Sequence, residues 1–585
     1  MKVAELTIRF CGIAGDGVVT SGRILANVCS DFGLNAMVND IYSAEIRGLG
    51  KSTTSVRFST RKVLSMGDGI DMLVGMADRE SISELNDVKP ECCVIYDNST
   101  PGDIKTEDSL AAHIPPELHG YGVPLKWLAN QASGSNTGRN LVAMGALCYL
   151  YSLPETYFIN HIKKLFGRKG ERIVEVNVKA FQLGFVYCEE NYPLRHEFEA
   201  PPKPVKQNLI GGNEAVCKGA IDWGLKFFAG YPITPATKIM EIAAKELPKR
   251  NGWTIQVEDE IAAISAVVGA GFAGKRAMTA TAGPGLSLMS EMINLAVMAE
   301  IPAVIVNVQR GGPSTGLPTK VEQSDLNIAL YGGAGDSPRV VIAPSDSEEC
   351  YRSIQLALDL AEKYQTPVIL LSDLFLGQRI ETVALEENID TERCTRKKPF
   401  ADHLKDYVRY QLTDDGISPL IVPGEPGAFY TVTGLEHTTK GTPNYESEVH
   451  QRMTEKRFRK FEAMQKELPP AEVLGDAEAK IGLVSWGSTV GAILEGMEIA
   501  RKQGVKSRLI KSMMINPQHE ASFREFFNTC EAIIVPEMNF QGQYAALLKS
   551  RYGIQPIEMQ VPAVNPVSPG KIANKIAEVA HAKRL

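Results

Sequence analysis

Three side chains in the middle of the chain are of types that could act on a small anionic substrate. Thr234 lies between two prolines in the string GYPITP, and their fixed φ holds its hydroxyl in place. Arg310 follows the apolar strand pattern AVIVNVQ, and its planar guanidinium suits a carboxylate bound through two hydrogen bonds. Glu260 heads the apolar helix pattern EIAAISAVVGAGFAG. A plain strand-to-helix turn around Thr234 and acidic helix capping by Glu260 are the structural alternatives.

Two loops rich in glycine lie close to these residues in the sequence. The strand pattern MTATA runs into Gly283-Pro284-Gly285 and then into the helix pattern LSLMSEMINLAVMAE. Arg310 is followed by GGPSTGLPTK, which contains Thr319 and Lys320 and has no evident packing role. In an open α/β sheet, ligands bind at the carboxyl ends of the strands, where these loops are expected.

The elements around these residues predict an α/β chain with mainly parallel sheets. Three regions alternate strand and helix patterns, which favours sheets covered by helices on both faces. We expect domains at residues 1–190, 208–382 and 471–585. A proline-rich linker at 191–207 and an irregular, charged connecting segment at 383–470 separate them.

The first region has a glycine loop of its own, GIAGDG at residues 12–17, between a strand and a helix pattern. Such a loop is either a tight turn without a ligand or a site for a phosphate-bearing ligand, and both interpretations stay open. Gly67-Asp68-Gly69 with Asp97-Asn98 approximates the motif by which thiamine enzymes hold Mg²⁺ and diphosphate. Asp-Gly is also a common turn, and we interpret this string as one.

Composition excludes several classes of protein. The 585 residues carry a formal charge of -7, with no stripe of Lys and Arg, so nucleic-acid binding is not expected. No run of 18 apolar residues and no leader pattern occurs, which predicts a cytoplasmic protein without a membrane partner. The ten cysteines lack chelating spacings, so no metal ion and no iron-sulfur cluster is expected in this chain.

These strings together resemble the 2-oxoacid:ferredoxin oxidoreductases, in the form where a γ domain is fused ahead of the α domain. GIAGDGVVTSGRILA and YSAEIRGLGKS resemble the γ domain. GYPITPAT, EDEIAAI, TATAGPGLSLMSE and QRGGPSTGLPT resemble the α domain, a pyrimidine-type thiamine diphosphate domain. VPEMNFQGQ resembles its transketolase C-terminal-like domain. Ala236 departs from the serine usual in the family, which is a conservative change.

The resemblance implies a role for each candidate residue. Glu260 would activate the thiamine aminopyrimidine, and Thr234 with Arg310 would orient the carboxylate and keto group of the substrate. Thr319 and Lys320 would be second substrate contacts, and the backbone at Tyr231, Pro232 and Ile233 would border the cofactor. Mg²⁺, the diphosphate half of the thiamine site and a [4Fe-4S] cluster would lie on a β subunit, without which the chain would be inactive.

The implied reaction is the reversible oxidative decarboxylation of a 2-oxoacid with coenzyme A and ferredoxin. The fused arrangement favours 2-oxoglutarate, giving succinyl-CoA and CO2, while pyruvate or a broad range of 2-oxoacids is the alternative. A self-sufficient thiamine enzyme would need the string at 67–69 to bind Mg²⁺. A non-catalytic ligand-binding protein is the alternative from another class.

Overall fold

The computed structural model describes residues 2–42, 50–99, 108–192, 196–201, 205–385, 394–399, 406–426, 429–562 and 564–585. Contacts divide the chain into two compact units. Unit 1 is Met1–Ile210 with Arg379–Leu385, and unit 2 is Gly211–Gln378 with Glu386–Leu585.

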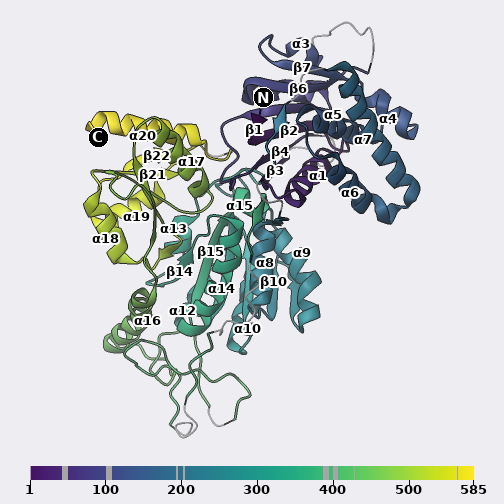
Figure 1. Cartoon of the computed structure of the whole chain (residues 1–585). Helices are drawn as coiled ribbons and strands as arrows, with labels where there is room; N and C mark the ends of the chain where they lie inside the picture. The colour runs from purple at the N-terminus through teal and green to yellow at the C-terminus, as the bar shows by residue number, and fades with distance from the viewer. Residues whose placement is uncertain are drawn as a thin grey trace. The chain divides into compact units, whose positions relative to one another are not determined.

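Unit 1 is built on an eight-stranded mixed sheet of order β7-β6-β5-β2-β4-β3-β16-β9. Figure 1 labels β7, β6, β2, β4 and β3 of this sheet. The pairs among β7, β6, β5 and β2 are parallel, and β2-β4, β4-β3 and β3-β16 are antiparallel. The strands are β2 Glu5–Ile13, β3 Asn35–Tyr42, β4 Lys51–Ser59, β5 Ile70–Gly75, β6 Val88–Asp97, β7 His119–Val123, β9 Asn208–Gly211 and β16 Ile380–Val383. A two-stranded sheet joins β1 Lys2–Val3 to β8 Glu197–Phe198.

The helices of unit 1 pack closely because glycines lie where they cross. A Cβ added to Gly145 or Gly184 would lie 1.9 or 2.0 Å from a carbonyl oxygen of the facing helix. The two glycines therefore allow α5 and α7 to approach at backbone distance. The helices are α1 Val18–Asp31, α2 Asp78–Ile82, α3 Leu110–His113, α4 Leu125–Ser133, α5 Arg139–Leu150, α6 Glu155–Phe166 and α7 Glu171–Asn191.

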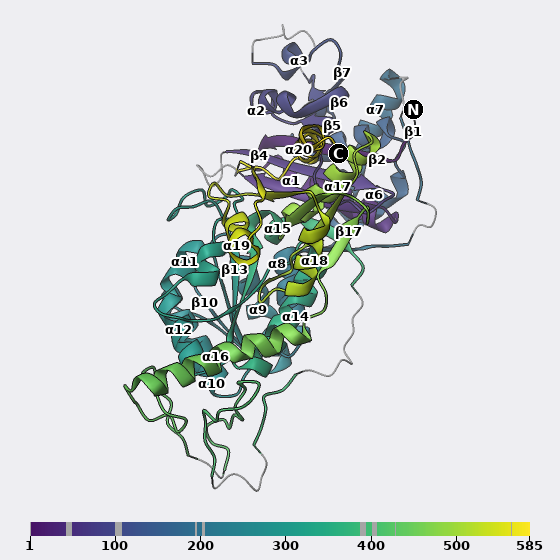
Figure 2. The same ribbon diagram turned by 90° about the vertical axis from the view of Figure 1, so that its left-hand side faces the viewer.

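Unit 2 contains a seven-stranded sheet of order β11-β10-β12-β13-β15-β14-β20, parallel except for β20. Helices α8, α9 and α14 form one layer and α10 and α12 belong to the other (Figure 2). The strands are β10 Phe227–Gly230, β11 Trp253–Gln256, β12 Ala277–Thr281, β13 Ala303–Gln309, β14 Val340–Ile342, β15 Pro367–Asp373 and β20 Met514–Asn516. The helices are α8 Gly212–Asp222, α9 Thr237–Glu246, α10 Glu260–Phe272, α11 Gly283–Leu288, α12 Ser290–Met298, α13 Leu326–Tyr331, α14 Ser347–Tyr364 and α15 Leu374–Gln378.

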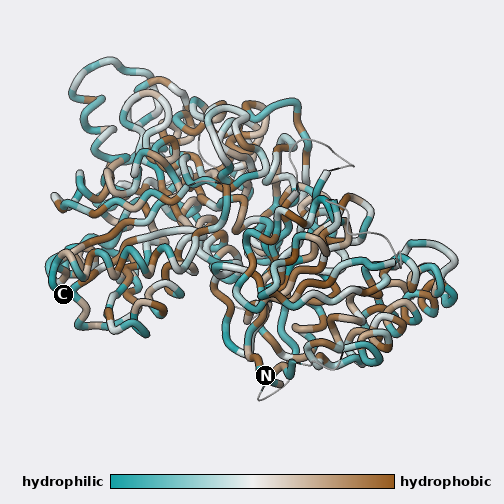
Figure 3. Tube along the Cα trace, turned by 90° about the horizontal axis from the view of Figure 1, so that it is seen from above, coloured by the Kyte–Doolittle hydropathy of each residue, from teal (hydrophilic) through white to brown (hydrophobic). Residues whose placement is uncertain are grey.

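The C-terminal part of unit 2 has a five-stranded sheet of order β17-β19-β18-β21-β22. Its strands are β17 Glu472–Gly475, β18 Ile481–Ser485, β19 Ser507–Lys511, β21 Ala532–Glu537 and β22 Ile557–Gln560. Its helices are α17 Thr489–Lys502, α18 Glu520–Thr529, α19 Gln543–Tyr552 and α20 Pro569–Lys583. Brown and teal alternate along the outer helices of the hydropathy trace, as amphipathic helices require (Figure 3). The predicted α/β fold with mainly parallel sheets is confirmed.

The structure differs from the sequence-based expectation in three places. Strand β16, which the expected boundary at 382 assigns to the second domain, is bonded to β3 in unit 1. The connecting segment contains a long helix, α16 Ser447–Glu467. The helix expected after Gly285 is two helices, α11 and α12, that meet at Met289. Along the described ranges, no helix has both the length and the apolar character needed to cross a bilayer.

Candidate functional site

The string GYPITP forms the turn between β10 and α9. The buried Asn213 side chain, at the start of α8, donates a hydrogen bond to the Pro235 carbonyl at 2.9 Å and so stabilises the turn. Thr234 itself is exposed. Its backbone carbonyl accepts a hydrogen bond from Arg310 Nη1 at 2.6 Å. Two of the residues predicted from sequence, Thr234 and Arg310, are therefore in direct contact.

Glu260 is the first residue of α10 and is buried, with 6% of its surface exposed. Asp259, not Glu260, caps the helix, because its carboxylate accepts from the Ala262 amide at 2.7 Å. A Cβ added to Gly285 would lie 2.7 Å from Glu260 Oε1 and 2.0 Å from Thr281 Oγ1. The Glu260 carboxyl therefore packs against the backbone of the Gly-Pro-Gly turn, where no side chain could fit.

Arg310 directly follows β13 at the carboxyl edge of the sheet and is 8% exposed. Its Nε has no hydrogen-bond partner, and among the described residues no carboxylate pairs with its guanidinium. Burial lowers the pKa of Arg310, and the charges of Asp325 and Glu260 oppose that shift. Arg310 and Glu260 thus lie within electrostatic range of each other. A buried cation with free donors is the arrangement that an anionic ligand completes.

The loop after Arg310 folds back on itself. The Gly311 amide donates to the Lys320 carbonyl, and the Leu317 amide donates to the Gly311 carbonyl, both at 2.9 Å. Thr319 Oγ1 is buried without a hydrogen-bond partner, and Lys320 is half-buried. The folded loop therefore holds Thr319 and Lys320 next to the chain that leads to Arg310.

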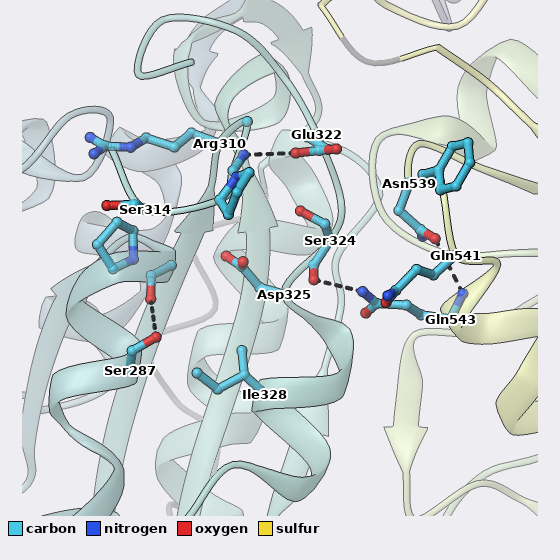
Figure 4. Close-up of a pocket in the computed structure, with 16 residues that line it drawn as sticks. Ser287, Arg310, Ser314, Glu322, Ser324, Asp325, Ile328, Asn539, Gln541 and Gln543 are labelled. Carbon is cyan, nitrogen blue, oxygen red and sulfur yellow. Dashed lines mark hydrogen bonds between the residues drawn. The ribbon is translucent and has the colours of Figure 1, made fainter. Parts of the chain in front are cut away.

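A cavity of about 600 Å³ opens beside Arg310 (Figure 4). Its walls come from the Gly283-Pro284 turn, the loop after β13, the start of α13 and the segment Asn539–Gln543. Ser324 and Asp325 lie between the Arg310 loop and the C-terminal segment in this view. Arg310 lines the cavity, and Glu260 lies behind the adjacent Gly285.

The C-terminal wall of the cavity is fixed by the string VPEMNFQGQ. Gln543 donates to the Ser324 carbonyl at 2.8 Å and accepts from the Asn327 amide at 3.0 Å. Glu537 is buried and accepts from the Tyr544 and Ala545 amides. Burial raises the pKa of Glu537. This string was part of the family resemblance, but its position in the cavity wall was not predicted.

No local pattern in the sequence marks Asp325, the second carboxyl near Arg310. Its Oδ2 accepts from Asn307 Nδ2 at 2.9 Å. Burial raises the pKa of Asp325 to about 6, with the hydrogen bond from Asn307 and the charge of Arg310 opposing and the charge of Glu322 adding to the rise. The neighbours come from β13 and from loops distant in sequence, so no local pattern marks this aspartate.

The string at residues 67–69 does not form a metal site with Asn98. Gly69 precedes β5, whereas Asn98 follows the carboxyl end of β6, and these two neighbouring strands are parallel. Because Val74 pairs with Ile95, Asn98 lies about eight residues along the strand direction from Gly69, which is roughly 26 Å at about 3.3 Å per residue. A self-sufficient thiamine enzyme based on this string is therefore excluded. No cluster of three metal-ligating side chains occurs in the part of the chain that the structure describes.

The glycine loop of unit 1 leads into α1 through Gly17, whose φ is 78°. Asp16 accepts from the Ile13 amide at 3.0 Å and pairs with Arg139 at the start of α5. The string YSAEIRGLGKS, with Glu45, Arg47 and Gly48, lies largely outside the described residues. The loop is thus a turn closed by an ion pair.

Comparisons with known proteins cover nearly the whole chain. Residues 7–187 match the family model described as pyruvate ferredoxin/flavodoxin oxidoreductase. Residues 218–456 match the model described as pyruvate flavodoxin/ferredoxin oxidoreductase, thiamine diphosphate-binding. The 2-oxoacid:ferredoxin oxidoreductase subunit alpha of Saccharolobus solfataricus is 34% identical over 93% of both chains. The 2-oxoglutarate oxidoreductase subunit KorA of Mycobacterium tuberculosis is 33% identical over 94% of this chain and 88% of its own.

A solved structure agrees with these matches. The 2-oxoglutarate:ferredoxin oxidoreductase of Magnetococcus marinus, with 2-oxoglutarate, coenzyme A and succinyl-CoA bound, is 38% identical. The match covers 98% of this chain and 99% of that chain, with a TM-score of 0.93. The chain therefore belongs to the 2-oxoacid:ferredoxin oxidoreductases, as a member of their α-subunit family.

Proposed function

We propose that this chain is the α subunit of a 2-oxoglutarate:ferredoxin oxidoreductase. With a β subunit, it converts 2-oxoglutarate and coenzyme A to succinyl-CoA and CO2, and ferredoxin accepts the electrons. The observation that carries the proposal is the pair of buried charges at the sheet edge, Glu260 and Arg310, which lie within electrostatic range of each other. The ligands bound to the Magnetococcus marinus enzyme support 2-oxoglutarate as the substrate.

The residues around Glu260 fit the aminopyrimidine half of thiamine diphosphate. When bound, this cofactor supplies the carbanion chemistry that removes CO2 from a 2-oxoacid. Glu260 holds its carboxyl against Gly285, where it would hydrogen-bond the pyrimidine nitrogen, and the backbone from Tyr231 to Ile233 would border the ring. Burial of the Glu260 carboxyl would exclude water from that hydrogen bond.

Arg310 and Thr234 orient the substrate. The Thr234 carbonyl holds one end of the guanidinium, which leaves Nε free for the 1-carboxylate. The exposed Thr234 hydroxyl is placed for the keto group, and Thr319 Oγ1 and Lys320 are second contacts. A charge-assisted pair of hydrogen bonds at Arg310 fixes the direction in which the substrate enters.

The β subunit supplies Mg²⁺, the diphosphate half of the thiamine site and the [4Fe-4S] cluster. Large apolar side chains exposed on elements of unit 2 support such a partner. They are Trp253, Ile255, Ile261 and Leu288, with exposed fractions of 71, 40, 47 and 51%. Trp253 and Ile255 are on the edge strand β11, Ile261 follows Glu260 on α10, and Leu288 ends α11. Exposed large apolar side chains are typical of a subunit interface.

The glycine loop of unit 1, with its helix N-terminus at Gly17, is the place in this chain that best suits a phosphate of coenzyme A. The complex acts in the cytoplasm, where ferredoxin is available.

The test is turnover by the complex. The chain is co-expressed with a β subunit of the same family and assayed with coenzyme A and ferredoxin against 2-oxoglutarate and pyruvate. We expect kcat/KM for 2-oxoglutarate to exceed that for pyruvate by at least about tenfold, since the reading of a second carboxylate supplies about 1.4 kcal/mol or more. A broad-range enzyme would show similar values for the two acids.

The Glu260→Gln variant tests the site itself. It keeps the shape of the side chain but cannot share a proton, so kcat falls by about 10² to 10⁴ while the complex still assembles and retains thiamine. Full turnover by this variant, or no turnover of any 2-oxoacid by the wild-type complex, would contradict the proposal. The second result would instead favour a non-catalytic ligand-binding protein.

A further inference from the structure

Asp325 is held in one position by two segments of unit 2, strand β13 and the Gly-Pro-Gly turn at Gly283. Its amide donates to Gln309 Oε1 at 3.1 Å, and its Oδ2 accepts from Asn307 at 2.9 Å. A Cβ added to Gly283 would lie 2.7 Å from Oδ1, so the carboxyl lies against the backbone of the Gly-Pro-Gly turn. The Glu260 carboxyl lies against Gly285 of the same turn. The turn therefore contacts two carboxyl groups, Asp325 at its first glycine and Glu260 at its second.

The Asp325 carboxyl lines the cavity with one oxygen uncommitted. In the described ranges Oδ1 has no hydrogen-bond partner, whereas Oδ2 is occupied by Asn307. Of the carboxyl groups near Arg310, Asp325 raises the pKa of the guanidinium the most, ahead of Glu260. When protonated, the Asp325 carboxyl can donate a hydrogen bond to a ligand in the cavity. When ionised, it competes with an anionic ligand for Arg310.

The charges that face Asp325 favour its neutral form. Burial raises the pKa of Asp325 to about 6, and the charge of Glu322, which also lines the cavity, adds to this rise. The hydrogen bond from Asn307 and the charge of Arg310 lower the pKa. With Asp325 and Glu322 both ionised, the cavity would hold two negative charges and one positive charge. A 2-oxoacid carries at least one more negative charge into this space. Binding of the 2-oxoacid therefore favours protonation of Asp325, the carboxyl whose pKa is already raised.

We propose that Asp325 binds the 2-oxoacid in its protonated form and donates its Oδ1 hydrogen to an oxygen of the substrate. This inference rests on the proposed function and adds a substrate contact to Thr234, Arg310, Thr319 and Lys320. The proton comes from solvent when the substrate binds and returns to solvent when the ligand leaves. A protonated carboxyl in a cavity wall is a strong donor that repels no anion.

The inference fixes the sign of a pH effect. Above pH 6 the empty site holds an ionised Asp325, so binding requires the uptake of one proton. The apparent affinity for the 2-oxoacid therefore falls as pH rises from about 6, by up to about tenfold per pH unit. In Asp325→Asn the amide mimics the neutral acid, and this dependence disappears.

The test is calorimetric titration of the α–β complex with N-oxalylglycine, an unreactive mimic of 2-oxoglutarate. Titrations in two buffers of different ionisation enthalpy count the protons taken up between pH 6 and 8. We expect about 0.9 proton per site at pH 7, from a pKa of about 6 in the empty site and full protonation in the bound state. The D325N complex should take up about one proton fewer, with KM independent of pH and kcat changed only a few-fold.

Asp336→Asn is the matched control, because it makes the same chemical change at an exposed carboxyl outside the cavity. Its proton uptake should equal that of the wild type. Binding by the wild type without proton uptake would overturn the inference, even if D325N did not assemble, and so would unchanged uptake in D325N. A wild-type complex that neither binds N-oxalylglycine nor turns over a 2-oxoacid would overturn the proposed function instead.

Discussion

Unit 2 contains two groups of buried charges that differ in whether their carboxylates form ion pairs. The first, the Glu300 cluster, consists of Glu300, Arg409, Lys456 and Lys460. Both oxygens of Glu300 are paired, with Lys456 Nζ at 2.6 Å and Lys460 Nζ at 2.6 Å. The two lysines also donate to backbone carbonyls, of Gly416 at 3.1 Å and Gln365 at 3.2 Å. Arg409 donates to the Glu300 carbonyl at 2.8 Å.

The second group, the Arg310 site, consists of Glu260, Arg310 and Asp325. Here Nε of Arg310 lacks a partner, and within the described residues no ion pair forms between the three. The comparison teaches that burial alone does not identify a functional site. Buried charges that pair with one another fix the fold, even though Arg409 Nε and Nη1 in the Glu300 cluster also lack hydrogen-bond partners. Buried charges without such ion pairs among the described residues, as at the Arg310 site, are available to a ligand.

The pKa shifts follow the same division. Burial acts to raise the pKa of Glu300, but Lys456, Lys460 and Arg409 outweigh it and hold that pKa well below its usual range. At Asp325 the single cation Arg310 does not outweigh burial, and the pKa rises to about 6. Three cations around Glu300 thus keep its carboxylate ionised at neutral pH. The single cation near Asp325 leaves a carboxyl that titrates close to neutral pH.

The largest effect is expected from breaking the Glu300 cluster. Glu300→Gln leaves Lys456 and Lys460 buried without a carboxylate, which costs about 3 to 5 kcal/mol of unfolding free energy. The thermal unfolding temperature of the purified complex should fall, while KM for the 2-oxoacid in the folded fraction stays unchanged. A variant as stable as the wild type would show that the pairing in this cluster does not fix the fold.

The opposite pattern is expected at Arg310. Arg310→Met removes the guanidinium but keeps a side chain of similar length, so kcat/KM should fall by about 10² to 10³, or about 3 to 4 kcal/mol. Because the buried cation has no carboxylate partner, its loss should leave the unfolding temperature equal or higher. A large loss of stability with little loss of activity would remove the distinction between the two groups.

Asp325 should affect stability in a pH window that its pKa defines. The folded-state pKa of about 6 lies above the usual 3.8. The free energy of unfolding therefore falls as pH rises from about 4 to 6, and it stays lower at higher pH. D325N should therefore raise the unfolding free energy at pH 8 by about 1 to 3 kcal/mol, and by much less at pH 4. Thermal unfolding at both pH values measures the difference. An equal effect at the two values would mean that the carboxyl does not titrate in this range.

Local patterns were sufficient for much of the fold and for the residues near the thiamine site. Prolines around Thr234, the apolar strand before Arg310 and the apolar helix after Glu260 are all signals carried by neighbouring residues. These signals predicted strands and helices at β10, β13 and α10, and the structure contains them. The Thr234–Arg310 hydrogen bond joins two such segments, and both follow parallel strands of one sheet.

Long-range partners explain what the sequence did not reveal. Helix α16 escaped prediction because its buried face includes Lys456, Arg457 and Lys460, which gives no apolar periodicity. Strand β16 joins β3 across more than three hundred residues. Asp325 depends on Asn307, Gln309 and Gly283, whose side-chain and backbone positions no local pattern specifies.

The smallest effect is expected from an ion pair on the surface. Arg352 and Glu348, four residues apart on α14, pair at 2.8 Å, and the Arg352 side chain is 62% exposed. Arg352→Gln should cost only about 0.2 to 0.5 kcal/mol, because water screens the pair in both states and the long side chains lose entropy when they pair. Thermal unfolding at low and high salt measures the cost, which should vanish at high salt. A loss near that of Glu300→Gln would mean that pairing matters without burial, and the contrast between the two buried groups would then need another physical basis.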